Sequence, residues 1–285
     1  MYAKLGDFKA CLTGFMLTLL PSLFPSIAAA TLYAAATVHQ GRCLYKRSVP
    51  DKRLLALFGV LALLAHGTAL FSQLLGHVGL SLDFFNSASL IAFAVITITL
   101  IACLSIPVEN LLVLLFPLGI VTTLLAQFMP SGTVQPIDEE PGILAHILLS
   151  LLAYGLFTIA AVQALLLLVQ NHQLKNKHPL VLIKNFPPLQ TMESLLFGFI
   201  WAGWGLLTLS LISGWLFLEN LLAQHLAHKT LLGCLAWIVF AVLLWGRNRL
   251  GWRGHKAIRW TLAGFCLLML AYFGSKLVRE YILHI

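Results

Sequence analysis

Charged residues are scarce in this chain. Asp, Glu, Lys and Arg together make up 10% of its 285 residues, against roughly a quarter in globular proteins. So few charges cannot cover a water-facing surface, which excludes an ordinary soluble domain. Intrinsic disorder is excluded too, because 60% of the residues are apolar and disordered chains are poor in such residues. The sequence therefore predicts an integral membrane protein.

Paired cysteines and enzyme signatures are absent as well. The five cysteines are scattered without a C-x-x-C spacing, so a disulfide framework, a zinc knuckle, a thiol-redox motif and covalent haem attachment have no support. The sequence also has no Walker A motif, no G-x-S-x-G and no H-E-x-x-H. We therefore expect that the protein is not an enzyme.

Long apolar runs dominate what is present. Runs of about 20 residues match the length of a helix that crosses the hydrocarbon core, whereas the strands of an outer-membrane barrel alternate polar and apolar residues. We predict an all-α polytopic membrane bundle of about eight helices, with residues 1–285 as one membrane domain. The tight turn at Pro107 leaves seven spans as an alternative. The predicted spans are roughly 16–38, 54–75, 86–106, 108–129, 141–169, 194–218, 229–246 and 257–278.

The net charge of +8 is unevenly distributed along the chain. Thirteen of the eighteen Lys and Arg residues fall in or beside the loops that follow the first, fifth and seventh spans. An excess of Lys and Arg marks cytoplasmic loops, so we predict a multi-pass protein of the bacterial inner membrane with both termini periplasmic. The same charge favours contact with anionic lipid over binding to nucleic acid.

His66 lies about twelve residues into the second predicted span. Gly59, Ala62, Ala69 and Gln73 recur around it at helical spacing, and such small residues let helices approach closely. An ionisable group at this depth is a candidate functional residue, because its charged form is costly in the membrane. The alternative is a structural histidine that is hydrogen-bonded to a neighbouring helix.

Three further histidines are predicted on the outer side. His146 follows Pro141 by five residues, which places it about 7 Å inside the expected start of the fifth helix. His228 lies before the seventh span, and His284 lies near the C-terminus. Interfacial snorkelling for His146 and solvated loops for the others are the alternatives. Imidazoles without carboxylate or cysteine partners favour a non-covalent, b-type haem with axial histidines, His66 and His146 being the preferred iron ligands.

The second half of the chain also resembles a known family. Residues 141–146, ending in His146 and followed by Tyr154, are similar to the histidine- and tyrosine-containing helix of the cytochrome c assembly (CcsA/CcmC-type) haem-handling family. The resemblance covers roughly residues 141–275 and is strongest to its short HemX/YpjD-like inner-membrane branch. Further similar segments follow in the same order, at 187–190, 205–209, Gly214, Trp237, 251–254 and 272–274.

This resemblance implies a protein that binds haem and holds or moves it during cytochrome maturation. Other maturation proteins or an apocytochrome would be its partners. By the resemblance, His146 corresponds to an outer-face haem ligand, His66 to a histidine within the membrane, and His284 lies one residue from a second outer-face ligand. The family's tryptophan-rich loop ending in W-D-P-K-E is missing: residues 219–229 stand in its place, and residues 228–230, beginning with His228, fall where P-K-E would be. Transport, sensing and storage of haem therefore stay open.

Two other classes of function remain as alternatives. A small-solute or ion permease would use broken helices at Pro21, Pro25 and Pro117, although the chain has no repeated halves and we expect no buried Asp or Glu for coupling. A non-catalytic assembly or regulatory subunit of a membrane complex is the other alternative.

Overall fold

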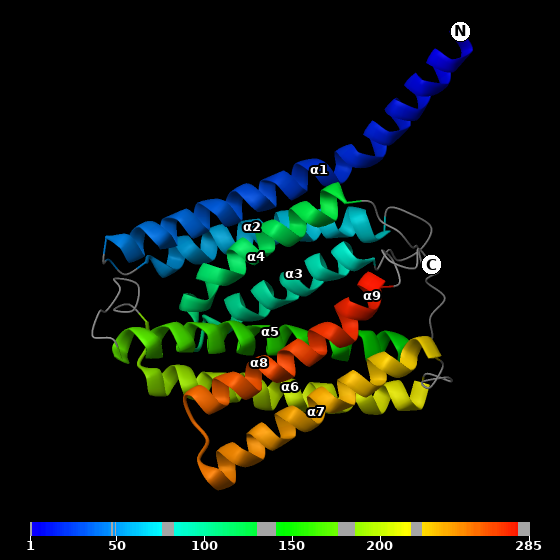
Figure 1. Ribbon diagram of the computed structural model, residues 1–285. Helices are drawn as coiled ribbons and strands as arrows, with labels where there is room; N and C mark the ends of the chain where they lie inside the picture. Colours follow the sequence, from blue (N-terminus) through cyan, green and yellow to red (C-terminus); the bar gives the residue numbers. More distant parts are fainter. Residues whose placement is uncertain are drawn as a thin grey trace.

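The computed structural model describes residues 2–46, 48, 50–75, 83–129, 141–175, 186–217 and 224–278. Within these ranges every regular element is helical (Figure 1). The elements are α1 (Tyr2–Tyr45), α2 (Lys52–Leu75), α3 (Phe84–Ala102), the 3₁₀ turn η1 (Glu109–Leu111), α4 (Leu112–Phe128), α5 (Pro141–Lys175), α6 (Leu189–Phe217), α7 (Gln224–Leu250), α8 (His255–Met269), the π-helical turn η3 (Leu270–Gly274) and α9 (Ser275–Leu277).

The predicted all-α membrane bundle is confirmed. In the described part of the chain, seven helices are long and apolar enough to cross a membrane, and α1 contains the remaining predicted span. Separate helices, α3 and α4, lie on either side of the turn at Pro107. The expected loop position of His228 is wrong, because α7 begins at Gln224 and already includes that residue. Hydropathy marks only the part of a helix within the hydrocarbon, and this helix extends beyond it.

Local sequence signals explain several helix boundaries. The side chain of Asp83 accepts a hydrogen bond of 2.7 Å from the backbone N–H of Asn86, which caps the N-terminus of α3. Pro141 is the first residue of α5, where its missing N–H leaves no hydrogen bond unmade. Between α7 and α8 the chain turns at Gly251 and Gly254, both with positive φ, a conformation that glycine adopts without steric cost.

The helices form two packed groups, α1–α4 and α5–α8 (Figure 1). Small residues allow close packing in both: a Cβ on Gly119 would lie 2.7 Å from the Ile96 side chain, and one on Gly264 would lie 2.7 Å from Phe240. Helix α3 also packs against α5, where a Cβ on Gly155 would lie 3.3 Å from Ile98. The two groups therefore meet along α3 and α5.

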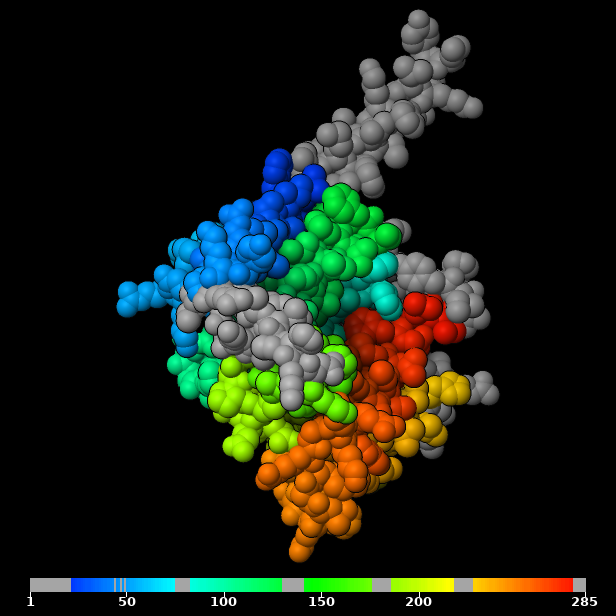
Figure 2. Space-filling view, turned by 60° about the vertical axis from the view of Figure 1, so that its left-hand side comes forward, coloured from blue at the N-terminus to red at the C-terminus, as the bar shows by residue number. Residues whose placement is uncertain are grey.

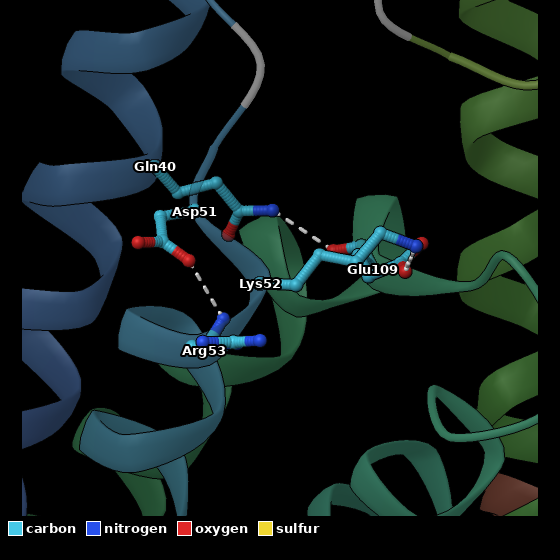
Figure 3. A network of polar contacts seen from close by, with 5 residues as sticks. All are labelled: Gln40, Asp51, Lys52, Arg53 and Glu109. Carbon is cyan, nitrogen blue, oxygen red and sulfur yellow. Dashed lines mark hydrogen bonds and ion pairs between the residues drawn. The ribbon is translucent and has the colours of Figure 1, made fainter.

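A polar network at one end fixes the first group (Figure 3). Gln40 donates a hydrogen bond of 2.8 Å to the backbone carbonyl of Glu109, and Lys52 forms an ion pair with the Glu109 carboxylate. Asp51 accepts a hydrogen bond of 2.9 Å from the backbone N–H of Arg53, at the start of α2. The α1–α2 connection and the α3–α4 turn therefore lie at the same end of the bundle, as an alternating up-and-down topology requires.

Candidate functional site

His66 lies where α1–α4 meet, and its side chain is completely buried. Its Nδ1 lies 3.2 Å from the Tyr33 hydroxyl on α1. Its Nε2 lies 2.9 Å from the Ser89 hydroxyl on α3 and 3.1 Å from the Thr123 hydroxyl on α4. The Phe93 ring packs edge-on at a centroid distance of 5.4 Å. One imidazole thus joins all four helices of this group through hydroxyl groups.

A second polar layer lies two helical turns from His66. Gln73 donates a hydrogen bond of 2.9 Å to the Gln127 side-chain carbonyl, which also accepts one of 3.0 Å from Ser26. Buried alanines, including Ala62 and Ala69, lie on the same side of α2. The stripe of small and polar residues recognised in the sequence therefore faces α1 and α4 and not lipid.

This packing bears on the ligand role predicted for His66. Both ring nitrogens are engaged in hydrogen bonds, and the ring is enclosed by side chains from three other helices. Binding of iron would require loss of the contacts at one nitrogen and displacement of the surrounding side chains. The contacts fit a structural histidine, and the ligand role of His66 stays a prediction.

His146 has a different environment, near the start of α5 and against α6. Its Nδ1 lies 2.8 Å from the backbone carbonyl of Ser210 and 3.3 Å from the Ser213 hydroxyl. A carbonyl oxygen only accepts, so Nδ1 is the protonated nitrogen. In a neutral imidazole the other nitrogen, Nε2, then carries the free lone pair. Among the described residues no hydrogen-bond partner approaches Nε2, and the side chain is half-buried.

The surface of α6 that faces His146 is built from small residues. A Cβ on Gly214 would lie 3.0 Å from Cε1 and 3.2 Å from Nδ1 of the imidazole, closer than ordinary packing allows. Ser210 also contacts Ser150, one turn after His146 on α5, at 2.7 Å between the hydroxyl oxygens. The absence of a side chain at Gly214 therefore permits the ring position that the Ser210 carbonyl fixes.

The arrangement around His146 fits one axial ligand of a haem iron. Histidines that bind metals commonly donate their other ring N–H to a backbone carbonyl, which sets the tautomer and the orientation of the ring. Within the described ranges no group of three or more His, Cys, Asp or Glu side chains is close enough to hold a bare metal ion. The donor set present here is a single oriented imidazole.

No contact of the other two predicted ligands with His66 or His146 is seen among the described residues. His228 is an exposed residue of α7, and His284 lies outside the described residues. The hydrogen-bond partners of His66 and His146 come from different helices, so the structure gives each its own site. The α6 partners of His146, Ser210 and Ser213, were not predicted from the sequence, where the only signal is the run of small residues that they form with Gly214.

Sequence segments that carry the family resemblance lie against one another in the fold. Tyr154 donates a hydrogen bond to the backbone carbonyl of Leu268, and its ring lies 5.6 Å from that of Tyr272 in the π-helical turn. Trp237 donates a hydrogen bond of 2.8 Å to the Thr208 hydroxyl. These residues join α5 to α8 and α6 to α7, so the shared segments build the interior of the second helix group.

Comparison with known proteins agrees with this architecture. The family model described as cytochrome C assembly protein matches residues 54–283, and so includes helices of both groups. The inner membrane protein YpjD of Escherichia coli K12 is 36% identical over 233 residues, which are 81% of this chain and 88% of that protein. No solved structure matches.

Two further relatives are less similar, and one of them is named for cytochrome c biogenesis. Protein HemX of Brevibacillus brevis is 24% identical over 162 residues, which are 55% of this chain and 60% of HemX. The cytochrome c biogenesis protein CcsA of Chlamydomonas reinhardtii is 24% identical over 216 residues, which are 72% of this chain and 60% of CcsA. The chain is a multi-pass membrane protein that belongs to the cytochrome c assembly family.

Proposed function

We propose that this protein binds a non-covalent b-type haem through Nε2 of His146 and serves cytochrome c assembly as a haem-binding factor without catalysis of its own. Membership of the family supports a role with haem. The observation that carries the proposal is the hydrogen bond from His146 Nδ1 to the Ser210 carbonyl, since it leaves Nε2 free for the iron.

The residues around His146 prepare it for this role. The Ser210 carbonyl selects the tautomer and holds the ring plane, and Gly214 leaves room for the ring. A ligand that is already oriented loses little freedom on binding. When bound, haem would supply a redox-active iron centre. His228 or His284 would provide the second ligand.

The position of His146 supports presentation of haem at one side of the membrane. Five residues separate it from the start of α5, so it lies about 7 Å from that end of the helix. By the charge bias of the loops this end is periplasmic, in the inner membrane of a bacterium and with both termini on the same side. An apocytochrome or another maturation protein is the partner that such a position favours.

Haem titration of the detergent-purified protein tests the proposal. The wild type should develop a Soret band that saturates at one haem per chain, and His146→Ala should lose most of this band. His255→Ala is the matched control, because His255 is an exposed histidine at the start of α8, and it should bind as the wild type does. Unchanged binding by His146→Ala would overturn the proposal.

A further inference from the structure

A groove lies between α7 and α8, beside the loop that joins them. It is lined by Val239, Trp252, Lys256, Arg259, Trp260 and Ala263, and its volume is about 570 Å³. These segments form the orange projection at the bottom of Figure 2. The groove lies in the second helix group and shares no lining residue with the contacts of His66 or His146.

The lining residues of α8 share one helix face and change in character along it. Lys256, Arg259, Trp260 and Ala263 follow the i, i+3, i+4, i+7 spacing of a single face. The two cations are exposed and lie in the first turns of the helix. Ala263 lies about 10 Å further along the axis, and Val239 lies about 16 Å from the end of α7. The groove is therefore cationic at its mouth and apolar toward the membrane interior.

The tryptophan at the mouth is held in place by the α7–α8 loop. The backbone N–H of Trp252 donates a hydrogen bond of 3.1 Å to the Gly246 carbonyl, and Arg247 donates one of 3.2 Å to the Trp252 carbonyl. A Cβ on Gly246 would lie 2.5 Å from the indole. The Trp252 and Trp260 rings lie 5.3 Å apart, and the Lys256 ammonium lies 5.9 Å from the Trp252 ring.

We propose that this groove binds one anionic phospholipid. Lys256 and Arg259 contact the phosphate, the two indoles lie at the level of the glycerol and ester groups, and Val239 and Ala263 contact an acyl chain. Charge complementarity carries the assignment, since the six lining residues include two cations and no acid. Glu193, an acidic residue near this loop, is occupied by the Gly254 N–H at 2.7 Å and faces Arg247 at 3.8 Å.

Native mass spectrometry of the purified full chain tests this site with two lipids of identical acyl chains. Phosphatidylglycerol should bind to the wild type with a stoichiometry of one and more tightly than phosphatidylcholine. The double variant K256Q/R259Q should bind phosphatidylglycerol roughly 25-fold more weakly, taking about fivefold for each basic residue near the surface. Its affinity for phosphatidylcholine should fall by much less, because the choline cation already offsets the charge of the same phosphate.

The control is R42Q/K175Q, which removes two exposed cations outside the groove and should keep the wild-type affinity. Trp260→Ala should lower the affinity for both lipids, because it removes a side chain that lines the groove. Inorganic phosphate in excess should not displace phosphatidylglycerol. The proposal is overturned if the two double variants bind phosphatidylglycerol with the same affinity, or if the wild type binds the two lipids with the same affinity. Displacement of phosphatidylglycerol by free phosphate would also overturn it.

Discussion

The two membrane histidines, His66 and His146, show how differently one side chain is used within a single bundle. His66 is enclosed by four helices, and both of its ring nitrogens contact hydroxyl groups. His146 uses one nitrogen to contact a backbone carbonyl and leaves the other free of hydrogen bonds from the described residues. Depth in the membrane does not identify a ligand. The contacts of the second nitrogen are the more informative observation.

The pattern around each histidine follows from the same principle. A buried polar group is costly unless it is hydrogen-bonded, so His66 needs partners on every side. Near the end of α5, His146 is half-buried, and one fixed contact is sufficient to orient it. The imidazole in the first group of helices thus contacts hydroxyls at both nitrogens, and the one in the second group keeps a nitrogen without a hydrogen bond from the described residues.

The largest effect on stability should come from His66→Ala. This change leaves the Tyr33, Ser89 and Thr123 hydroxyls without their shared partner, at a cost of about 2 kcal/mol. Thermal unfolding in detergent measures the loss. His255→Ala, at an exposed position, should unfold as the wild type does. Equal stability of the two variants would show that the His66 network contributes nothing to packing.

Gly214→Ala should weaken haem binding roughly tenfold, as do other changes that disturb the orientation of a metal ligand. The added methyl group would lie 3.0 Å from the imidazole and push it away from the Ser210 carbonyl. Gly198→Ala on the same helix is the matched control, since beyond its own turn of helix no atom of the described residues lies within 4 Å of the added Cβ. Haem titration should show a lower affinity for Gly214→Ala than for Gly198→Ala. Equal affinities would show that Gly214 does not affect the position of the ligand.

Ser210→Ala should have the smallest effect. The orienting group is the backbone carbonyl of Ser210, which this substitution keeps, while the contact with the Ser150 hydroxyl is lost. Haem affinity should fall by less than about threefold, the scale of one interhelical hydrogen bond in a membrane. A loss as large as that of His146→Ala would mean that the hydroxyl, and not the carbonyl, holds the ring.

The fold was predictable because the apolar runs extend over whole helices. Spans such as 54–75 differ from the observed helix α2 (Lys52–Leu75) by only a few residues. The start of α7 was not predictable from hydropathy, since the helix extends past its apolar part and includes His228. The small residues around His66 correctly indicated a face turned toward other helices.

The contacts of the candidate site were less predictable. The partners of His66 come from Tyr33, Ser89 and Thr123, which lie on three other helices, and no spacing in the sequence relates them. The partner of His146 is a backbone carbonyl. Every residue has such a group, so the residue type does not indicate which one will accept the hydrogen bond. Sequence patterns therefore indicated which histidines to consider, while the packing of the helices decides what each can bind.

Rescue of a cavity variant by free imidazole tests the central claim most directly. In His146→Gly the haem spectrum should be lost and then restored by millimolar imidazole, because the added ligand takes the place of the missing side chain. The same titration of His66→Gly should show haem binding without any need for imidazole. Ligation of haem by His146 is contradicted if His146→Gly keeps the wild-type spectrum, or if imidazole restores the spectrum of His66→Gly instead.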